Sequence, residues 1–154
     1  MTVFEFGIGI LVIVLTFCLM ELVAWSTHKH VMHGFLWVLH EDHHRYTGRV
    51  LEKNDLFAVF FCLLAIVSIY FGVMYGISTL TAFGIGVTLY GFGYFTVHDV
   101  LFHRRIKAIR FRPQKGYLRR VLYAHSQHHQ HSTPTSGVSF GFLYAGPRWE
   151  VPAA

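Results

Sequence analysis

Three long apolar runs constrain this chain more than any other feature of its sequence. They cover residues 3–26, 56–77 and 80–97, and they carry almost no charged side chains. An α-helix rises about 1.5 Å per residue, so runs of this length can cross the roughly 30 Å hydrocarbon core of a bilayer. The sequence therefore predicts an all-α integral membrane protein with three, or at most four, transmembrane helices.

The composition agrees with that prediction, since 53% of the residues are hydrophobic and only 14% are charged. We interpret the first run as a span rather than a signal peptide, because no Lys or Arg precedes it and it exceeds a signal core in length. The 154 residues predict a single domain over 1–154. Cys18 and Cys62 both lie in apolar runs, which argues against a disulfide framework.

The charges predict an orientation in the membrane. All 13 Lys and Arg residues lie between the first two spans or after the third. By the positive-inside rule those regions face the cytoplasm. The two spans 56–77 and 80–97 then form a hairpin that turns at Ser78 and Thr79. All 12 histidines follow the first span and avoid this hairpin, so they are expected on the cytoplasmic face.

The histidines form four clusters within two regions, 28–55 and 98–131. The stretch HKHVMHGFLWVLHEDHH opens the first region and contains a His-x-x-His-His triplet, and the second region contains another. On a helix, three such positions project from one face. Each triplet follows a pair of histidines that are five residues apart. The pairs are His28 with His33 and His98 with His103, and the triplets are His40, His43, His44 and His125, His128, His129.

This number of histidines predicts a metal centre with more than one ion. Neutral imidazole suits Zn, Cu, Fe and Ni, but a tetrahedral zinc site takes four ligands at most. Ten imidazoles can fill two nearly octahedral spheres and leave positions open for a small molecule. Residues five apart on an α-helix diverge by about 140°, so each pair requires the helix to end, widen or bend. Geometry alone leaves His30 and His131 as alternative ligands.

Several motifs resemble one known family. HKHVMHG, HEDHH, LEKNDLFAV, HDVLFHRR and AHSQHH are similar to the histidine boxes and flanks of the bacterial-type β-carotene hydroxylases, within the fatty acid hydroxylase superfamily of membrane di-iron enzymes. The resemblance covers residues 28–129. It implies ten iron ligands and leaves His30 and His131 outside the set. These ligands are His28, His33, His40, His43, His44, His98, His103, His125, His128 and His129.

The same resemblance implies the reaction and its cofactors. Two non-heme irons and O2 would hydroxylate C3 of the β-ionone rings of a carotenoid, with electrons from an external donor such as a ferredoxin. The first five ligands would form one half of the centre and the last five the other half. A fatty acyl or sterol substrate is the first alternative. A membrane metal-binding or transport protein is the second, although its histidines should lie along the spans as a path.

Four carboxylates and one basic segment have more than one interpretation. Glu41, Asp42 and Asp99 adjoin predicted ligands, so they are either acceptors for imidazole N–H groups or solvated charges. Glu21 lies near the end of an apolar span, where it has a partner or reaches the headgroups. The segment 104–120 carries eight basic residues and favours anionic lipid over nucleic acid, with an acidic electron donor as a third partner. The tail 132–154 is predicted to be a loop or cap.

Overall fold

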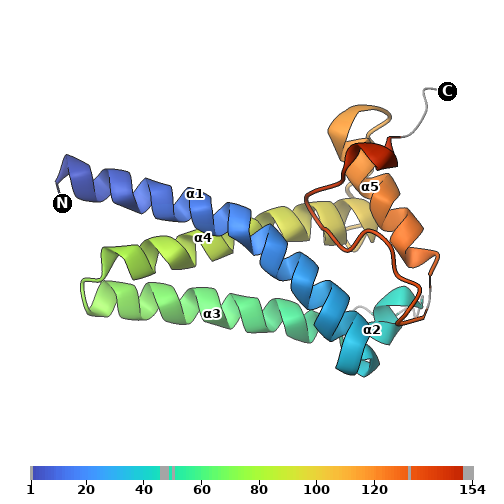
Figure 1. Cartoon of the computed structure of the whole chain (residues 1–154), viewed down its shortest axis with the longest axis horizontal. Helices are drawn as coiled ribbons and strands as arrows, with labels where there is room; N and C mark the ends of the chain where they lie inside the picture. The colour runs from blue at the N-terminus through green and yellow to red at the C-terminus, as the bar shows by residue number, and fades with distance from the viewer. Residues whose placement is uncertain (1, 46–48, 50, 132, 151–154) are drawn as a thin grey trace. The chain divides into compact units, whose positions relative to one another are not determined.

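The computed structural model describes residues 2–45, 49, 51–131 and 133–150. Parts of the predicted region 28–55 and of the tail 132–154 therefore lie outside the described residues. The described part is helical and contains no strand (Figure 1). Its elements are α1 (Val3–Ser26), η1 (Thr27–Phe35), α2 (Trp37–His44), α3 (Asp55–Met74), α4 (Ser78–Tyr94), η2 (Phe95–Phe102), α5 (Gly116–His129) and the short η3 (Pro147–Trp149).

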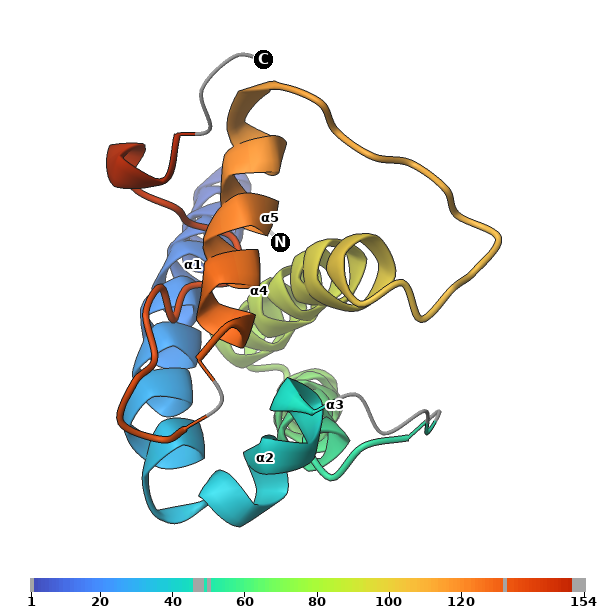
Figure 2. The ribbon, with the colours of Figure 1, turned by 90° about the vertical axis from the view of Figure 1, so that its right-hand side faces the viewer.

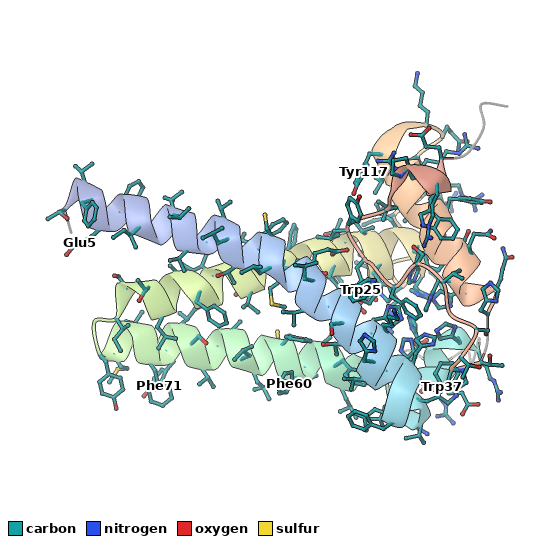
Figure 3. The ribbon with its side chains drawn as sticks, in the orientation of Figure 1. Glu5, Trp25, Trp37, Phe60, Phe71 and Tyr117 are labelled. Carbon is teal, nitrogen blue, oxygen red and sulfur yellow. The ribbon has the colours of Figure 1, made fainter. Side chains whose placement is uncertain are left out.

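Three helices are long and apolar enough to cross a membrane, as the sequence predicts. They cover Val3–Phe35, Asp55–Met74 and Ser78–Phe102. Their side chains are mostly exposed in the isolated chain, and Figure 3 shows those of Phe60 and Phe71 projecting outward from α3. Exposed apolar surface of this extent marks contact with lipid. Cys18 and Cys62 are free thiols on these helices.

The hairpin of α3 and α4 turns three residues earlier than the sequence predicts. We expected the second span to run to Ile77, but α3 ends at Met74 and Ser78 already begins α4. Gly76 has φ of 67°, a left-handed conformation that glycine adopts without strain. The Ile77 N–H donates to the Gly72 carbonyl over 2.8 Å, which completes a glycine-terminated helix end. The turn is therefore set by Gly76 and not by Ser78 and Thr79.

Small residues bring the spans into close contact. A Cβ added to Gly72 would lie 2.6 Å from the backbone N of Thr81, and one added to Gly84 would lie 2.9 Å from the carbonyl O of Ala65. Gly86 makes the same kind of approach to α1 at Thr16. Such approaches stabilise helix packing in lipid, where the hydrophobic effect does not act between helices.

The chain packs into two compact units. The span unit comprises residues 1–20 and 55–92, and the histidine unit comprises 21–54 and 93–154. Each unit is assembled from segments that are distant in sequence, and every histidine belongs to the histidine unit. The prediction of a single domain over 1–154 stays a prediction.

Within the histidine unit, two apolar helices continue as π-helices. These are η1, which follows α1 and contains a kink at Gly34, and η2, which follows α4. After η2 the chain runs as an extended loop before it enters α5 (Figure 2). The buried residues Val121, Ala124 and Ala145 pack α5 against the C-terminal segment.

Candidate metal centre

Ten histidines converge into two groups of five. In each group, one ring nitrogen from every residue lies within 4.8 Å of one from every other. The ten are the residues predicted from the sequence, and His30 and His131 belong to neither group. Group A consists of His28, His33, His40, His44 and His128, and group B consists of His43, His98, His103, His125 and His129.

The π-helices explain how histidines five residues apart reach one site. Of the three possibilities that the spacing left open, the helix widens at both pairs. A π-helix forms hydrogen bonds between residues five apart, so such residues lie almost one above the other. In η2 this bond joins the two predicted ligands themselves, because the His103 N–H donates to the His98 carbonyl over 2.9 Å. In η1, His28 and His33 both point into group A, with ring centroids 5.1 Å apart.

The two triplets do not divide as we expected. His40 and His44 belong to group A, but His43 between them belongs to group B. His125 and His129 belong to group B, but His128 belongs to group A. The expectation that each half of the chain supplies one half of the centre is therefore wrong by one residue on each side. Every group combines a π-helical pair, an α-helical pair and one residue from the opposite triplet.

Six of the histidines direct Nδ1 at an oxygen acceptor, which places the ring proton on Nδ1 and the free lone pair on Nε2. Backbone carbonyls of the C-terminal segment accept three of these bonds, and side chains accept the other three. The pairs are His28 with Phe140 O (2.9 Å), His33 with Pro134 O (3.2 Å), His128 with Val138 O (2.7 Å), His40 with Asn54 Oδ1 (2.7 Å), His43 with Glu52 Oε2 (2.9 Å) and His98 with Asp99 Oδ1 (2.7 Å).

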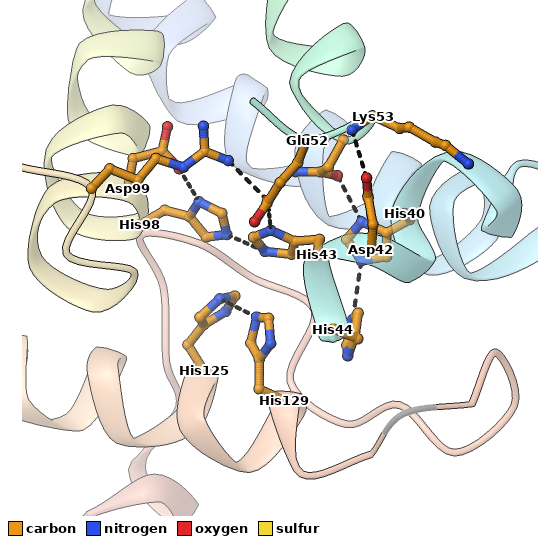
Figure 4. Close-up of polar contacts among 12 residues, drawn as sticks. His40, Asp42, His43, His44, Glu52, Lys53, His98, Asp99, His125 and His129 are labelled. Carbon is orange, nitrogen blue, oxygen red and sulfur yellow. Dashed lines mark hydrogen bonds and ion pairs between the residues drawn. The ribbon is translucent and has the colours of Figure 1, made fainter. Parts of the chain in front are cut away.

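These same six rings face one another through their Nε2 atoms. Figure 4 shows His43 and His98 meeting in this way, with Glu52 and Asp99 on the far sides of the two rings. Because each Nδ1 already carries the proton, neither Nε2 can donate to the other, and two lone pairs this close repel unless a cation lies between them. The three Nε2 pairs are His28 with His40 (3.1 Å), His33 with His128 (3.1 Å) and His43 with His98 (3.0 Å).

The nitrogen separations fit two metal ions. A metal–imidazole bond of about 2.1 Å places neighbouring ligands of an octahedral ion about 3.0 Å apart and opposite ligands about 4.2 Å apart. The separations of 3.0–3.1 Å match the first value, and the 4.8 Å limit includes the second. Five imidazoles per ion leave one octahedral position for another small ligand. The residues present therefore fit a dinuclear centre of first-row metals.

Burial keeps the ligands neutral outside the spans. Removal from solvent lowers the pKa of His40, His44 and His128 to about 3 each, and that of His103 to about 4. Part of this lowering comes from neighbouring histidines for the first three, and from Arg105 for His103. Neutral imidazole is the form that binds metal, so the site is prepared for metal at neutral pH.

The four carboxylates that the sequence singles out take different roles. Asp99 accepts the ring proton of His98, as one of its two interpretations predicts. Glu41 instead forms an ion pair with Arg45 at 2.9 Å, and Asp42 accepts the backbone N–H of Lys53, so their role as imidazole acceptors was wrong. Glu21 has a partner, because its carboxylate accepts backbone N–H groups of the C-terminal segment.

Sequence reasoning missed the acceptors that are distant from the triplets. Glu52 and Asn54 belong to the motif LEKNDLFAV, whose only significance in the sequence is its resemblance to the family. Asn54 is only 4% exposed, which is unusual for an amide and is the kind of burial that signals a role. The three backbone carbonyls of the tail carry no signal in their side chains.

His30 and His131 belong to neither group. His30 is exposed and packs edge-on against Trp25 at the end of α1, with ring centroids 5.9 Å apart. His131 follows α5, and its backbone N–H donates to the carbonyl of His128. The basic residues 104–115 lie mainly on the extended loop between η2 and α5, where most are exposed.

Comparisons with known proteins agree with this geometry. The model of the fatty acid hydroxylase family matches residues 13–146. A protein of Pantoea ananas named beta-carotene hydroxylase is 44% identical over 143 residues, which is 93% of this chain and 81% of that protein. One of the same name from Paracoccus sp. (strain PC1) is 43% identical over 138 residues, covering 89% and 84%.

More distant relatives come from plants. A chloroplastic beta-carotene hydroxylase of Capsicum annuum is 37% identical over 132 residues, which is 84% of this chain and 42% of that protein. No solved structure gives a significant match.

Proposed function

The chain belongs to the fatty acid hydroxylase family, and from this premise we propose that it adds hydroxyl groups to carotenoid rings with O2 as the oxidant. The resemblance that the histidine motifs indicated is thereby confirmed. The bacterial relatives, at 42–44% identity over most of the chain, are named beta-carotene hydroxylases. The proposed reaction is hydroxylation at C3 of the β-ionone ring, which converts β-carotene to β-cryptoxanthin and then to zeaxanthin.

The observation that supports this proposal best is the pair of five-histidine groups. We propose that all ten of these histidines bind two irons, one in group A and one in group B, and that His30 and His131 bind none. The chemistry supplied by bound iron would be reductive activation of O2 and removal of hydrogen from an unactivated ring carbon. A single zinc would leave most of the ten nitrogens without a ligand role.

Residues of the chain hold the imidazole rings in position for the proposed metals. In six of the ten rings the oxygen acceptors hold the proton on Nδ1, so that Nε2 stays available and the ring cannot rotate out of place. Burial of His28, His40 and His128, each at most 1% exposed, keeps water from competing for the metals. Asp99 and Glu52 add negative charge beside two ligands of group B, which favours retention of a highly charged ion.

The substrate and the electrons are proposed to arrive from different phases. A carotenoid dissolves in the hydrocarbon core that α1, α3 and α4 are long enough to cross. The histidines directly follow two of these helices in sequence, so the centre would lie near the cytoplasmic boundary of a bacterial inner membrane. Electrons would come from a soluble acidic donor such as a ferredoxin. The exposed basic loop could bind that donor or anionic lipid.

Expression in cells that accumulate β-carotene tests the proposal. Pigment extracts separated by chromatography should contain zeaxanthin and β-cryptoxanthin, and a His43→Ala variant should leave β-carotene unchanged. Lipid extracts of the same cells report hydroxylated fatty acids and sterols, which are the alternative products. Unchanged β-carotene in cells whose purified protein contains iron would refute the carotenoid assignment.

A further inference from the structure

A single carboxylate anchors the C-terminal segment to α1. We call residues 133–146 the strap. The Glu21 carboxylate accepts three successive backbone N–H groups of the strap, those of Phe142 (3.0 Å), Leu143 (3.1 Å) and Tyr144 (2.9 Å). Hydrogen bonds to an ionised acceptor are about twice as strong as neutral ones, and here three converge on one group. Glu21 lies seven residues before His28, two turns earlier on the same continuous helix.

The strap then leads directly to the ligands of group A. Its carbonyls at Pro134, Val138 and Phe140 accept the ring protons of three histidines, all of which belong to that group. The Phe142 ring also stacks on His28, with centroids 4.8 Å apart and planes 16° apart. Phe142 touches rings of group B as well, but a ring contact does not decide which nitrogen carries the proton. The strap thus sets the tautomers of three of the five ligands in group A.

Two of the ring protons of group B are accepted by carboxylates and not by the strap. The group B ligands His43 and His98 donate to the carboxylates of Glu52 and Asp99. Arg105 joins these two carboxylates, since its Nη2 donates to Glu52 Oε2 over 2.9 Å and its Nε lies 3.8 Å from Asp99 Oδ1. These contacts come from the segments 52–54 and 98–105 and use no strap carbonyl. The acceptors are anionic here, whereas those that the strap offers to group A are neutral amides.

We propose that Glu21 is a positioning residue for the group A metal, whereas Arg105 has the corresponding role for the group B metal. This inference rests on the proposed di-iron centre and adds that a different charged residue supports each of the two irons. Without the Glu21 carboxylate, the strap loses its anchor to α1, although Leu143 and Ala145 keep their hydrogen bonds to the Tyr117 hydroxyl. The three carbonyls then shift away from the ring protons of group A. The group B ligands keep their carboxylates.

The strap offers a second way to disturb the same contact without changing charge. A Cβ added to Gly141 would lie 2.8 Å from Glu21 Oε1 and 2.7 Å from the Tyr144 carbonyl O, so the strap must move. Gly146 is the matched control, because the nearest atom to its added Cβ is the Tyr144 hydroxyl at 4.0 Å. Glu5 is the control for the carboxylate, since it lies on the same helix and its Oε2 accepts the backbone N–H of Thr2, far from the strap in sequence.

The experiment loads the purified full chain with ⁵⁷Fe(II) without oxygen and measures iron per chain and the Mössbauer spectrum. The wild type, Glu5→Ala and Gly146→Ala should bind two irons per chain. Glu21→Ala and Gly141→Ala should bind about one and lose one of the two iron signals. Arg105→Gln should lose the other signal. Hydrogen exchange at the amides of Phe142, Leu143 and Tyr144 should rise at least tenfold in Glu21→Ala and stay unchanged in Arg105→Gln.

Two outcomes would overturn the inference. The first is two irons with the wild-type spectrum in both Glu21→Ala and Gly141→Ala. The second is loss of both signals together in a Gly141→Ala protein that keeps the wild-type far-ultraviolet circular dichroism. If Glu21→Ala fails to fold, Gly141→Ala decides alone, because it retains every charge. Fewer than two irons in the wild type would instead refute the di-iron centre. A lack of hydroxylated product would count against the proposed reaction but not against the assignment of Glu21 and Arg105, which rests on the iron measurements.

Discussion

Replacement of Asn54 tests the assignment of the ring protons most directly. The side chain is buried, and its Oδ1 accepts the Nδ1 proton of His40 over 2.7 Å. In Asn54→Leu the size is kept but the acceptor is lost, so a buried N–H remains without a partner. Such a group costs about 1–3 kcal/mol. The folded chain bears this cost with or without metal; loss of the hydrogen-bond partner of a ligating histidine should lower the affinity for the group A metal about 10- to 100-fold.

Asn54→Asp is the decisive companion variant, because a carboxylate can only accept. If His40 donates through Nδ1, Asp should keep or raise the metal affinity, since a more basic acceptor makes the imidazole a better ligand. The assay is competition for Fe(II) against a chelator of known affinity, with Glu41→Gln as a control, because Glu41 pairs with Arg45. If Asp weakened binding as much as Leu, then Asn54 would be donating its amide N–H to His40. The proton would then lie on Nε2, and His40 would not be a ligand.

Three other perturbations probe the ligand set, its burial and the hairpin turn. His43→Ala should abolish turnover and remove iron, whereas His131→Ala should retain both, as measured by iron content and product; full iron in His43→Ala would refute the ligand set. The pKa of His40 and of His128 is about 3 in the folded chain, below the value near 6.5 in the unfolded chain. Below pH 6.5 the unfolded chain therefore binds more protons than the folded chain. The metal-free protein should lose stability as the pH falls through this range. The loss is about 1.4 kcal/mol per pH unit for each such histidine, and a Tm that stays constant to pH 4 would contradict it. Gly76→Ala should destabilise the hairpin by about 1–2 kcal/mol, because alanine is strained at φ of 67°, and unchanged resistance to denaturant would speak against that turn.

The sequence was sufficient to predict the spans and the requirement for unusual helix geometry. Long apolar runs predict helices because every backbone N–H and C=O of a membrane span must be hydrogen-bonded within the protein. The five-residue spacing of His28 and His33 is incompatible with a shared face on an α-helix, so a local change was required. The sequence did not say whether the helix would end, bend or widen. Whether the helix ends, bends or widens depends on how η1 and η2 pack against their surroundings, and local sequence patterns do not predict this packing.

The partners of the ring protons were beyond sequence reasoning for a different reason. A carboxylate next to a histidine in sequence is easily proposed as the acceptor of its ring proton. Of the three carboxylates proposed in this way, only Asp99 has that role. Glu41 and Asp42 follow His40 on α2, where neighbouring residues point in different directions. The carbonyl of Phe140 is a generic backbone group 112 residues from His28. Its role comes from the course of the strap, which the Glu21 carboxylate fixes through contacts equally distant in sequence.

The exchange of one ligand between the triplets follows from helix geometry. On an α-helix of about 100° per residue, His44 lies about 40° from His40 in one direction and His43 about 60° from it in the other. The triplet therefore presents two adjacent rings to one group and a third ring, turned away from them, to the other group. The triplet on α5 does the same with His125 and His129 against His128. A His-x-x-His-His motif on a helix that lies between two metals is suited to bridge them. Since each triplet supplies both groups, deletion of either one would remove ligands from both ions, whereas loss of a π-helical pair would remove two ligands from only one.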